Sequence, residues 1–177
     1  MKIKRIALIG LGAMGVFFAP RLYEAFGDDF YIIAGGERKK RLESKGVTIN
    51  GVNYRFPIVT PEEQGEPADL ILIGVKGYGF AQAIEDIRHQ VGEHTLILSL
   101  LNGVDSEEQL IQAFGEEHVL YAYMRMSIVM KDGKADFDPC SRRRNYQYTA
   151  RGGHARSGSK GRRIAGLHPR GYHASAV

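Results

Sequence analysis

The sequence has one cysteine, no tryptophan and no long apolar run. Cys140 stands alone, which excludes an internal disulfide. The six scattered histidines form no zinc-type spacing with it, so no metal site is expected. No apolar run reaches the roughly 18 residues that a membrane helix requires. These absences favour a soluble, cytoplasmic protein without a membrane partner.

Acidic residues are missing from the last part of the 177-residue chain. The segment from Cys140 to Val177 contains nine of the 24 Lys and Arg residues and no Asp or Glu. The segment from Met1 to Pro139 contains the other 15 and all 20 acidic residues. The net charge of +4 and the pI near 9.2 therefore describe the end of the chain. An overall basic charge is consequently weak evidence for a nucleic-acid partner.

The basic tail at residues 140–177 also lacks aliphatic residues and periodicity, so we expect it to be disordered. Two explanations of its composition stay open. A shifted reading frame would account for the abrupt loss of acids, and an RNA-binding tail would use Arg142 to Arg144 beside Tyr146 and Tyr148. A single folded domain is predicted over residues 1–139.

The rest of the chain alternates between strand-like and helix-like segments. Aliphatic runs predict buried strands at Ile3–Ile9, Phe30–Ala34, Leu70–Val75 and Thr95–Leu101. Helical spacing or capping predicts helices at Met14–Phe26, Arg38–Lys45, Phe80–Val91 and from Ser106 onward. Ser106 and Gln109 are expected to form a capping box, and Pro20 to kink the first helix. This alternation predicts an α/β fold, a doubly wound parallel sheet with helices on both faces.

Two further features accompany the main sheet. Asn50-Gly51 joins Val47–Ile49 to Val52–Val59, which predicts a small β-hairpin insertion. Val119–Met130 predicts another strand, followed by a turn at Lys131 to Lys134 and a last short strand. An apolar surface near Val119–Met130 is expected to drive association into a homo-oligomer.

A glycine motif, Gly10-Leu11-Gly12-Ala13-Met14-Gly15, lies directly between the first predicted strand and helix. Gly10 permits a tight turn, Gly12 lets the backbone approach a pyrophosphate, and Gly15 allows the helix to pack closely on the strand. The helix N-terminus adds free amides and the positive end of its dipole. This context indicates a Rossmann-type dinucleotide-binding domain, with a plain glycine turn as the alternative.

The segment after the second predicted strand selects among dinucleotides. An NAD site has an acidic residue there that accepts hydrogen bonds from the ribose 2′-hydroxyl. In this chain positive charge dominates, and Arg38 and Lys39 are suited to a 2′-phosphate, which favours NADPH. Glu37 leaves NAD as an alternative cofactor. The cations are also open to interpretation as a solvated helix face that binds no phosphate.

Lys76 and Asn102 directly follow two predicted strands. They are therefore placed at the carboxyl edge of the sheet, where ligands bind in folds of this kind. Lys76 would hold a carboxylate or carbonyl, and Asn102 would orient the ribose or the substrate. A surface lysine and an Asn-Gly turn are the alternatives. Tyr78 is interpreted as a packing residue.

Three motifs in this order and spacing resemble the N-terminal domain of ketopantoate reductase, 2-dehydropantoate 2-reductase. They are Gly10 to Gly15, Ala68 to Tyr78 and Leu101 to Val104. The resemblance covers Lys2 to about Asp138. It implies NADPH on the glycine turn, a basic residue near Arg38 for the 2′-phosphate, and Lys76 and Asn102 where the nicotinamide meets a 2-keto acid.

The resemblance also implies a reaction, the reduction of 2-dehydropantoate to pantoate on the route to pantothenate and coenzyme A. The family's proton-donating lysine lies in a second, helical domain that nothing between Cys140 and Val177 matches. No catalytic residue is therefore assigned, and weak cofactor binding with little turnover is expected. Two alternatives stay open: another NAD(P)-dependent 2-hydroxy- or keto-acid dehydrogenase, and a non-catalytic nucleotide- or RNA-binding protein that uses the tail.

Overall fold

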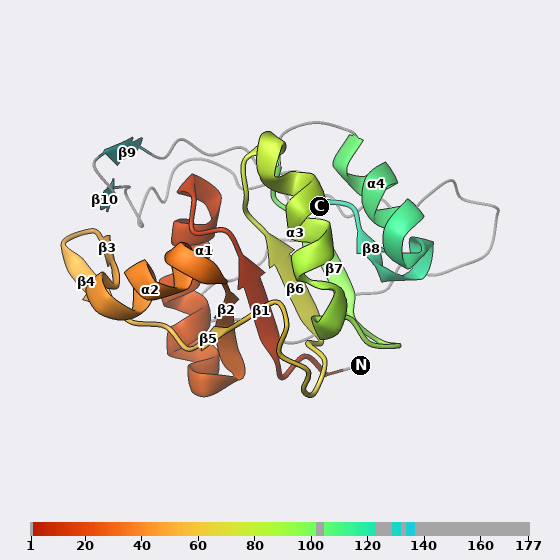
Figure 1. The fold of residues 1–177 in the computed structure, drawn as a ribbon, viewed down its shortest axis with the longest axis horizontal. Coiled ribbons are helices and arrows are strands. Elements are labelled where there is room, and N and C mark those ends of the chain that lie inside the picture. The colour runs from red at the N-terminus through yellow and green to blue at the C-terminus, as the bar shows by residue number, and fades with distance from the viewer. Residues whose placement is uncertain (1, 102–104, 123–128, 132–133, 137–177) are drawn as a thin grey trace, which may run out of the picture.

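The computed structural model describes residues 2–101, 105–122, 129–131 and 134–136 of the chain. At its centre lies a six-stranded parallel sheet in the order β5-β2-β1-β6-β7-β8 (Figure 1). The chain begins in the middle of the sheet at β1, proceeds to one edge, and then crosses back to build the other half. This order confirms the predicted Rossmann-type, doubly wound fold.

The strands of this sheet are short. They are β1 (Ile6–Ile9), β2 (Phe30–Ile33), β5 (Ile58–Val59), β6 (Leu70–Ile73), β7 (Leu96–Ser99) and β8 (Val119–Leu120). All residues of β1, β2 and β6 are buried, as expected for aliphatic strands covered on both faces. Ile6 and Leu8 point into one hydrophobic core, and Ala7 and Ile9 into the other.

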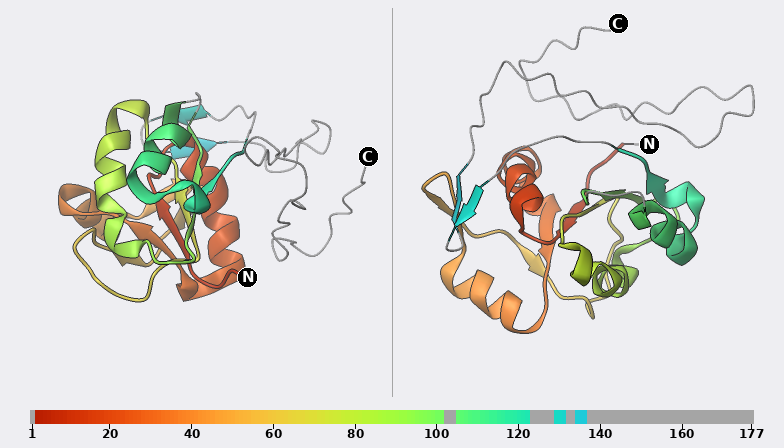
Figure 2. Two further views of the ribbon diagram at one scale, coloured as in Figure 1. Left: turned by 90° about the vertical axis from the view of Figure 1, so that its right-hand side faces the viewer. Right: turned by 90° about the horizontal axis from the view of Figure 1, so that it is seen from above.

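Helices cover both faces of the sheet (Figure 2). Helix α1 (Ala13–Phe26) packs on one face, and α3 (Phe80–Asp86) and α4 (Asp105–Phe114) pack on the other. Helix α2 (Gly36–Lys45) follows β2. Single 3₁₀ turns are η1 (Gly27–Asp29), η2 (Gly77–Gly79), η3 (Arg88–Gln90) and η4 (Glu116–His118). Pro20 lies inside α1, and a kink there stays a prediction. Within the described ranges, every helix is too short or too polar to cross a bilayer.

A second sheet contains the predicted hairpin. Strands β3 (Val47–Ile49) and β4 (Val52–Tyr54) pair antiparallel, and Asn50 and Gly51 between them have the positive φ values, 47° and 79°, that a tight hairpin turn requires. Strands β9 (Val129–Lys131) and β10 (Lys134–Asp136) extend the hairpin into a four-stranded sheet in the order β4-β3-β10-β9. The hairpin insertion is therefore confirmed, but it is not an isolated element.

Two predicted strands are wrong in extent. The run Val52–Val59 divides, because Pro57 cannot donate to a ladder, and β5 beyond it pairs with β2 in the main sheet. The run Val119–Met130 also divides, since β8 ends at Leu120 and β9 belongs to the other sheet. Residues 123–128, half of the segment expected to drive association, lie outside the described residues, as does the basic tail.

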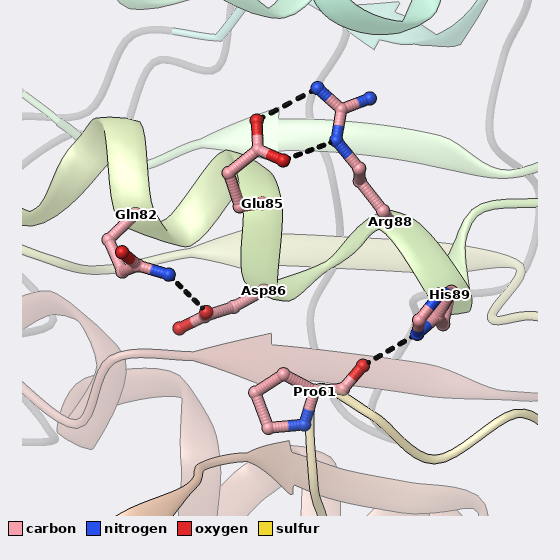
Figure 3. A network of polar contacts seen from close by, with 6 residues as sticks. All are labelled: Pro61, Gln82, Glu85, Asp86, Arg88 and His89. Carbon is pink, nitrogen blue, oxygen red and sulfur yellow. Dashed lines mark hydrogen bonds and ion pairs between the residues drawn. The ribbon is translucent and has the colours of Figure 1, made fainter.

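The crossover from β5 to β6, residues 60–69, contains no helix and is held by side chains of η3 instead. His89 Nδ1 lies 2.9 Å from the Pro61 carbonyl oxygen (Figure 3). Gln90 Nε2 donates to the Glu63 carbonyl at 2.9 Å, and Gln90 Oε1 accepts from the Tyr31 hydroxyl at 2.8 Å. One buried amide therefore ties the crossover to β2.

Candidate functional site

Four glycines meet where β1, α1 and β6 come together. A Cβ on Gly10, which has a φ of +94°, would lie 2.7 Å from the Gly74 carbonyl carbon and the Val75 nitrogen. A Cβ on Gly15 would lie 2.0 Å from the Gly10 oxygen, and one on Gly74 would lie 2.9 Å from the same atom. Gly12 has a little more room, at 3.2 Å from the Gly74 oxygen. The turn after β1 passes this close to β6 because these positions have no side chain.

The glycine turn leads into an uncapped N-terminus of α1. Gly12 is the N-cap residue and offers no side chain to the first amides, and its carbonyl accepts the first intrahelical bond from Val16 at 2.9 Å. The N–H groups of Ala13, Met14 and Gly15 precede that bond, and the first turn contains no acid. Free amides and the positive end of the dipole thus lie between β1 and β6, where the strand order reverses and ligands bind.

The predicted cations lie at the start of α2, on the same edge of the sheet. Arg38 is exposed and has no hydrogen-bond or ion-pair partner among the described residues. Lys39 is engaged, with its Nζ 3.4 Å from Glu43 Oε1. Glu37, the acid that left NAD as an alternative, forms an ion pair with Lys40, with Glu37 Oε1 2.8 Å from Lys40 Nζ. Of the two predicted cations, Arg38 is therefore the one without an ion-pair partner among the described residues.

Lys76 is exposed and is the third residue after β6; Gly74 and Val75, which stand between them, contact the turn at Gly10. Asn102, predicted to lie near it, falls outside the described residues. The interpretation of Tyr78 as a packing residue is wrong within the described part of the chain, since this side chain is 90% exposed. A cavity of about 260 Å³ lies beside it, lined by Gly77, Tyr78, Phe80, Ala81, Leu101, Asp105, Ser106 and Gln109.

The predicted capping box is also wrong. Helix α4 begins at Asp105, one residue earlier than predicted, so Ser106 lies inside its first turn. The Ser106 hydroxyl donates to Glu107 Oε2 at 2.7 Å instead of accepting from a backbone amide. The acids of the first turn still favour this helix start through the helix dipole.

Gly74 is the site residue that sequence reasoning missed. It packs against Gly10, Gly12 and Gly15, and its N–H donates to the Ile9 carbonyl at 2.8 Å. The available signal was a glycine at the carboxyl end of an otherwise aliphatic strand, where a close backbone approach is the usual reason for one.

The family model described as ketopantoate reductase PanE/ApbA matches residues 6–139. The chain belongs to the ketopantoate reductase family. The uncharacterized oxidoreductase YkpB of Bacillus subtilis is 29% identical to it over 120 residues, which cover 66% of this chain and 39% of the relative. A 2-dehydropantoate 2-reductase of Streptococcus pyogenes serotype M1 is 27% identical over 118 residues, covering 65% and 38%. This family member thus spans about two fifths of the length of the curated relatives it matches.

A solved structure extends the likeness to another oxidoreductase. The ternary structure of D-mandelate dehydrogenase with NADH and anilino(oxo)acetate has a TM-score of 0.62 and 27% identity, covering 74% of this chain and 44% of that one. That structure of D-mandelate dehydrogenase contains NADH.

Proposed function

We propose that this chain binds NADPH and belongs to an enzyme that reduces a 2-keto acid, with 2-dehydropantoate as the best-supported substrate. The contact among four glycines carries this proposal, because it brings the uncapped N-terminus of α1 into the crevice between β1 and β6. The amides of the turn from Gly10 through Leu11 and Gly12 to Gly15 would donate to the pyrophosphate, with Ala13 and Met14 in the first turn of the helix.

The choice of NADPH rests on Arg38. Its side chain is exposed and unpaired among the described residues, three residues after the N-cap Gly35, which offers no side chain to the first amides. A planar fork of N–H donors suits a phosphate monoester, and the salt-bridged Lys39 would add positive charge. Glu37, the acid in the first turn of α2, is paired with Lys40 and is not expected to replace the ribose-binding carboxylate of NAD sites.

The keto acid would lie at the same edge of the sheet. NADPH supplies a hydride when bound, and the keto carbon of the substrate receives it. Lys76, exposed after β6, would attract the carboxylate or polarise the carbonyl, and Asn102 would orient the ribose or the substrate. No proton donor is assigned to this chain.

A second candidate is NADH-dependent reduction of an aryl 2-keto acid. The structural match to D-mandelate dehydrogenase with NADH favours it, as does the exposed ring of Tyr78 beside the cavity. Titrating 2-dehydropantoate or benzoylformate into cofactor-saturated protein, and comparing the two dissociation constants, ranks the two substrates without requiring turnover.

Cofactor titrations of Arg38→Gln test the proposal. The loss of a charge-assisted hydrogen bond is expected to weaken NADPH binding about ten- to a hundredfold and to leave NADH binding unchanged. Arg41→Gln is the matched control, since it removes the same charge one turn further along α2. Equal affinity of the wild-type chain for both cofactors, or equal effects of the two substitutions, would contradict the NADPH assignment.

A further inference from the structure

Helix α2 is held only weakly by packing. Seven of its ten residues are charged, and Leu42 is its one buried residue. A helix of this length is marginal on its own in water, and one without an apolar stripe is not oriented by burial. Contacts at the two ends of the helix must therefore fix its tilt, and with it the place of Arg38.

At the C-terminal end, three of these contacts come from two side chains, those of Asn53 on β4 and Arg55 directly after it. A helix leaves four carbonyl groups free at its C-terminus, and in α2 each of them accepts a hydrogen bond. The pairs are Gly46 N–H to Leu42 O at 2.8 Å, Arg55 Nη1 to Glu43 O, Arg55 Nη2 to Ser44 O at 3.0 Å, and Asn53 Nδ2 to Lys45 O at 2.9 Å.

The hairpin also approaches the end of the helix closely, as Figure 1 shows. A Cβ on Gly46 would lie 2.5 Å from the Tyr54 oxygen and 2.7 Å from Asn53 Oδ1. The opposite end of α2 is held by the main sheet, since Ala34 N–H donates to the Val59 carbonyl at 3.0 Å, and its N-cap residue, Gly35, offers no side chain to the first amides of the helix. One end of the helix is therefore fastened to the hairpin, and the other faces the proposed nucleotide site.

We propose that Arg55 and Asn53 are positioning residues for Arg38, and that the hairpin thereby sets the preference for a dinucleotide with a 2′-phosphate. The inference rests on the proposed role of Arg38. About 9 Å of helix separates Arg38 from Ser44, a distance over which a hydrogen-bonded helix moves as a rigid rod. A tilt at the fastened end consequently displaces the guanidinium, while the glycine turn that would hold the pyrophosphate stays in place.

Binding titrations with NADPH and NADH test this on the chain as it stands. Arg55→Ala removes two solvent-exposed hydrogen bonds to the last carbonyls of α2, so it is expected to weaken NADPH binding about fivefold and to leave NADH affinity unchanged. Asn53→Ala, which frees one carbonyl, should act in the same direction with a smaller effect. Arg55→Lys should restore part of the loss, because an ammonium still interacts favourably with the last carbonyls of a helix. Val52→Thr, an exposed change on β4, is the matched control and should alter neither affinity.

The double variant separates positioning from a general loss of structure. If Arg55 acts through Arg38, Arg55→Ala has no further effect on the ratio of the two affinities once Arg38 is glutamine. An unchanged ratio in Arg55→Ala, beside a reduced ratio in Arg38→Gln, would overturn the inference and leave the proposed function standing. An unchanged ratio in Arg38→Gln would instead overturn the proposed function. Parallel losses for both cofactors in Arg55→Ala would show a structural role alone.

Discussion

Replacing Gly15 with alanine sets two effects of known sign against each other. Alanine is the better helix former by about 0.8–1.0 kcal/mol, which on its own would stabilise α1. Its Cβ, however, would lie 2.0 Å from the Gly10 oxygen, 1 Å inside the 3.0 Å below which such contacts are essentially not found. The neighbouring atoms are backbone on both sides, so the helix and the turn must separate. Overpacking of this kind costs about 1–3 kcal/mol, and the clash should therefore win.

Two measurements follow the effect of Gly15→Ala. The melting temperature should fall by several degrees, at roughly 2–8 °C for each kcal/mol in a domain of this size. The dissociation constant for NADPH should rise about tenfold, corresponding to about 1.4 kcal/mol, because the amides of the turn no longer converge on one phosphate. Gly65→Ala is the matched control, since its Cβ meets nothing within 4 Å, and it should change neither quantity substantially.

The two readouts separate an error about packing from an error about binding. A Gly15→Ala variant as stable as the Gly65→Ala control would refute the close contact between turn and helix. A destabilised variant with unaltered NADPH affinity would support the close packing, but it would contradict the assignment of the glycine cluster to the binding site.

Two further predictions concern the cores. Burial raises the pKa of the Tyr31 phenol above its ordinary value of 10.0, although Arg5 acts to lower it. The free energy that the neutral phenol contributes to folding is therefore fully present below pH 10.0, and it is lost as the pH rises through the pKa of the folded state. Urea unfolding should therefore show the wild-type chain losing stability more steeply than Tyr31→Phe in alkaline solution, and parallel curves would contradict this. The Phe56 ring contacts those of Tyr23, Phe30 and Tyr54 at centroid distances of 5.4–5.7 Å, so Phe56→Ala should cost about 3–5 kcal/mol. Tyr78→Ala, at an exposed ring, should change the free energy of unfolding by less than about 0.5 kcal/mol, and a similar loss in both variants would argue against this aromatic cluster.

The sequence predicted the main sheet because its signals are local. Each buried strand is a short aliphatic run, and the glycine turn stands directly between a strand and a helix. The prediction assigned the residues of β5 to the hairpin strand, because they and the residues of β4 both favour extended backbone. Which sheet a strand enters depends on partners that are distant in the sequence. The pairing of β10 with β3 is likewise non-local, because no sequence signal near Val47–Ile49 indicates a partner strand so much later in the chain.

The site was predictable where backbone conformation dictates the residue type, and less so where side chains choose partners. Gly10 and Gly15 follow from the motif, but the ion pairs that engage Lys39 and Glu37 depend on helix rotamers that spacing alone does not fix. Gly74 acquires its meaning from a contact across the sheet. The exposure of Tyr78 could not be deduced, because an aromatic residue after a buried strand is packed in most proteins.

The outermost strands β5 and β8 have two residues each, which limits what a neighbouring molecule can do. A foreign strand that docks on such a border finds too few unpaired amides and carbonyls to form a lasting ladder. The aliphatic strands of four residues, which would make better templates, lie in the interior of the sheet. Even at high concentration, sheet-to-sheet polymerisation through this part of the molecule should accordingly be slow.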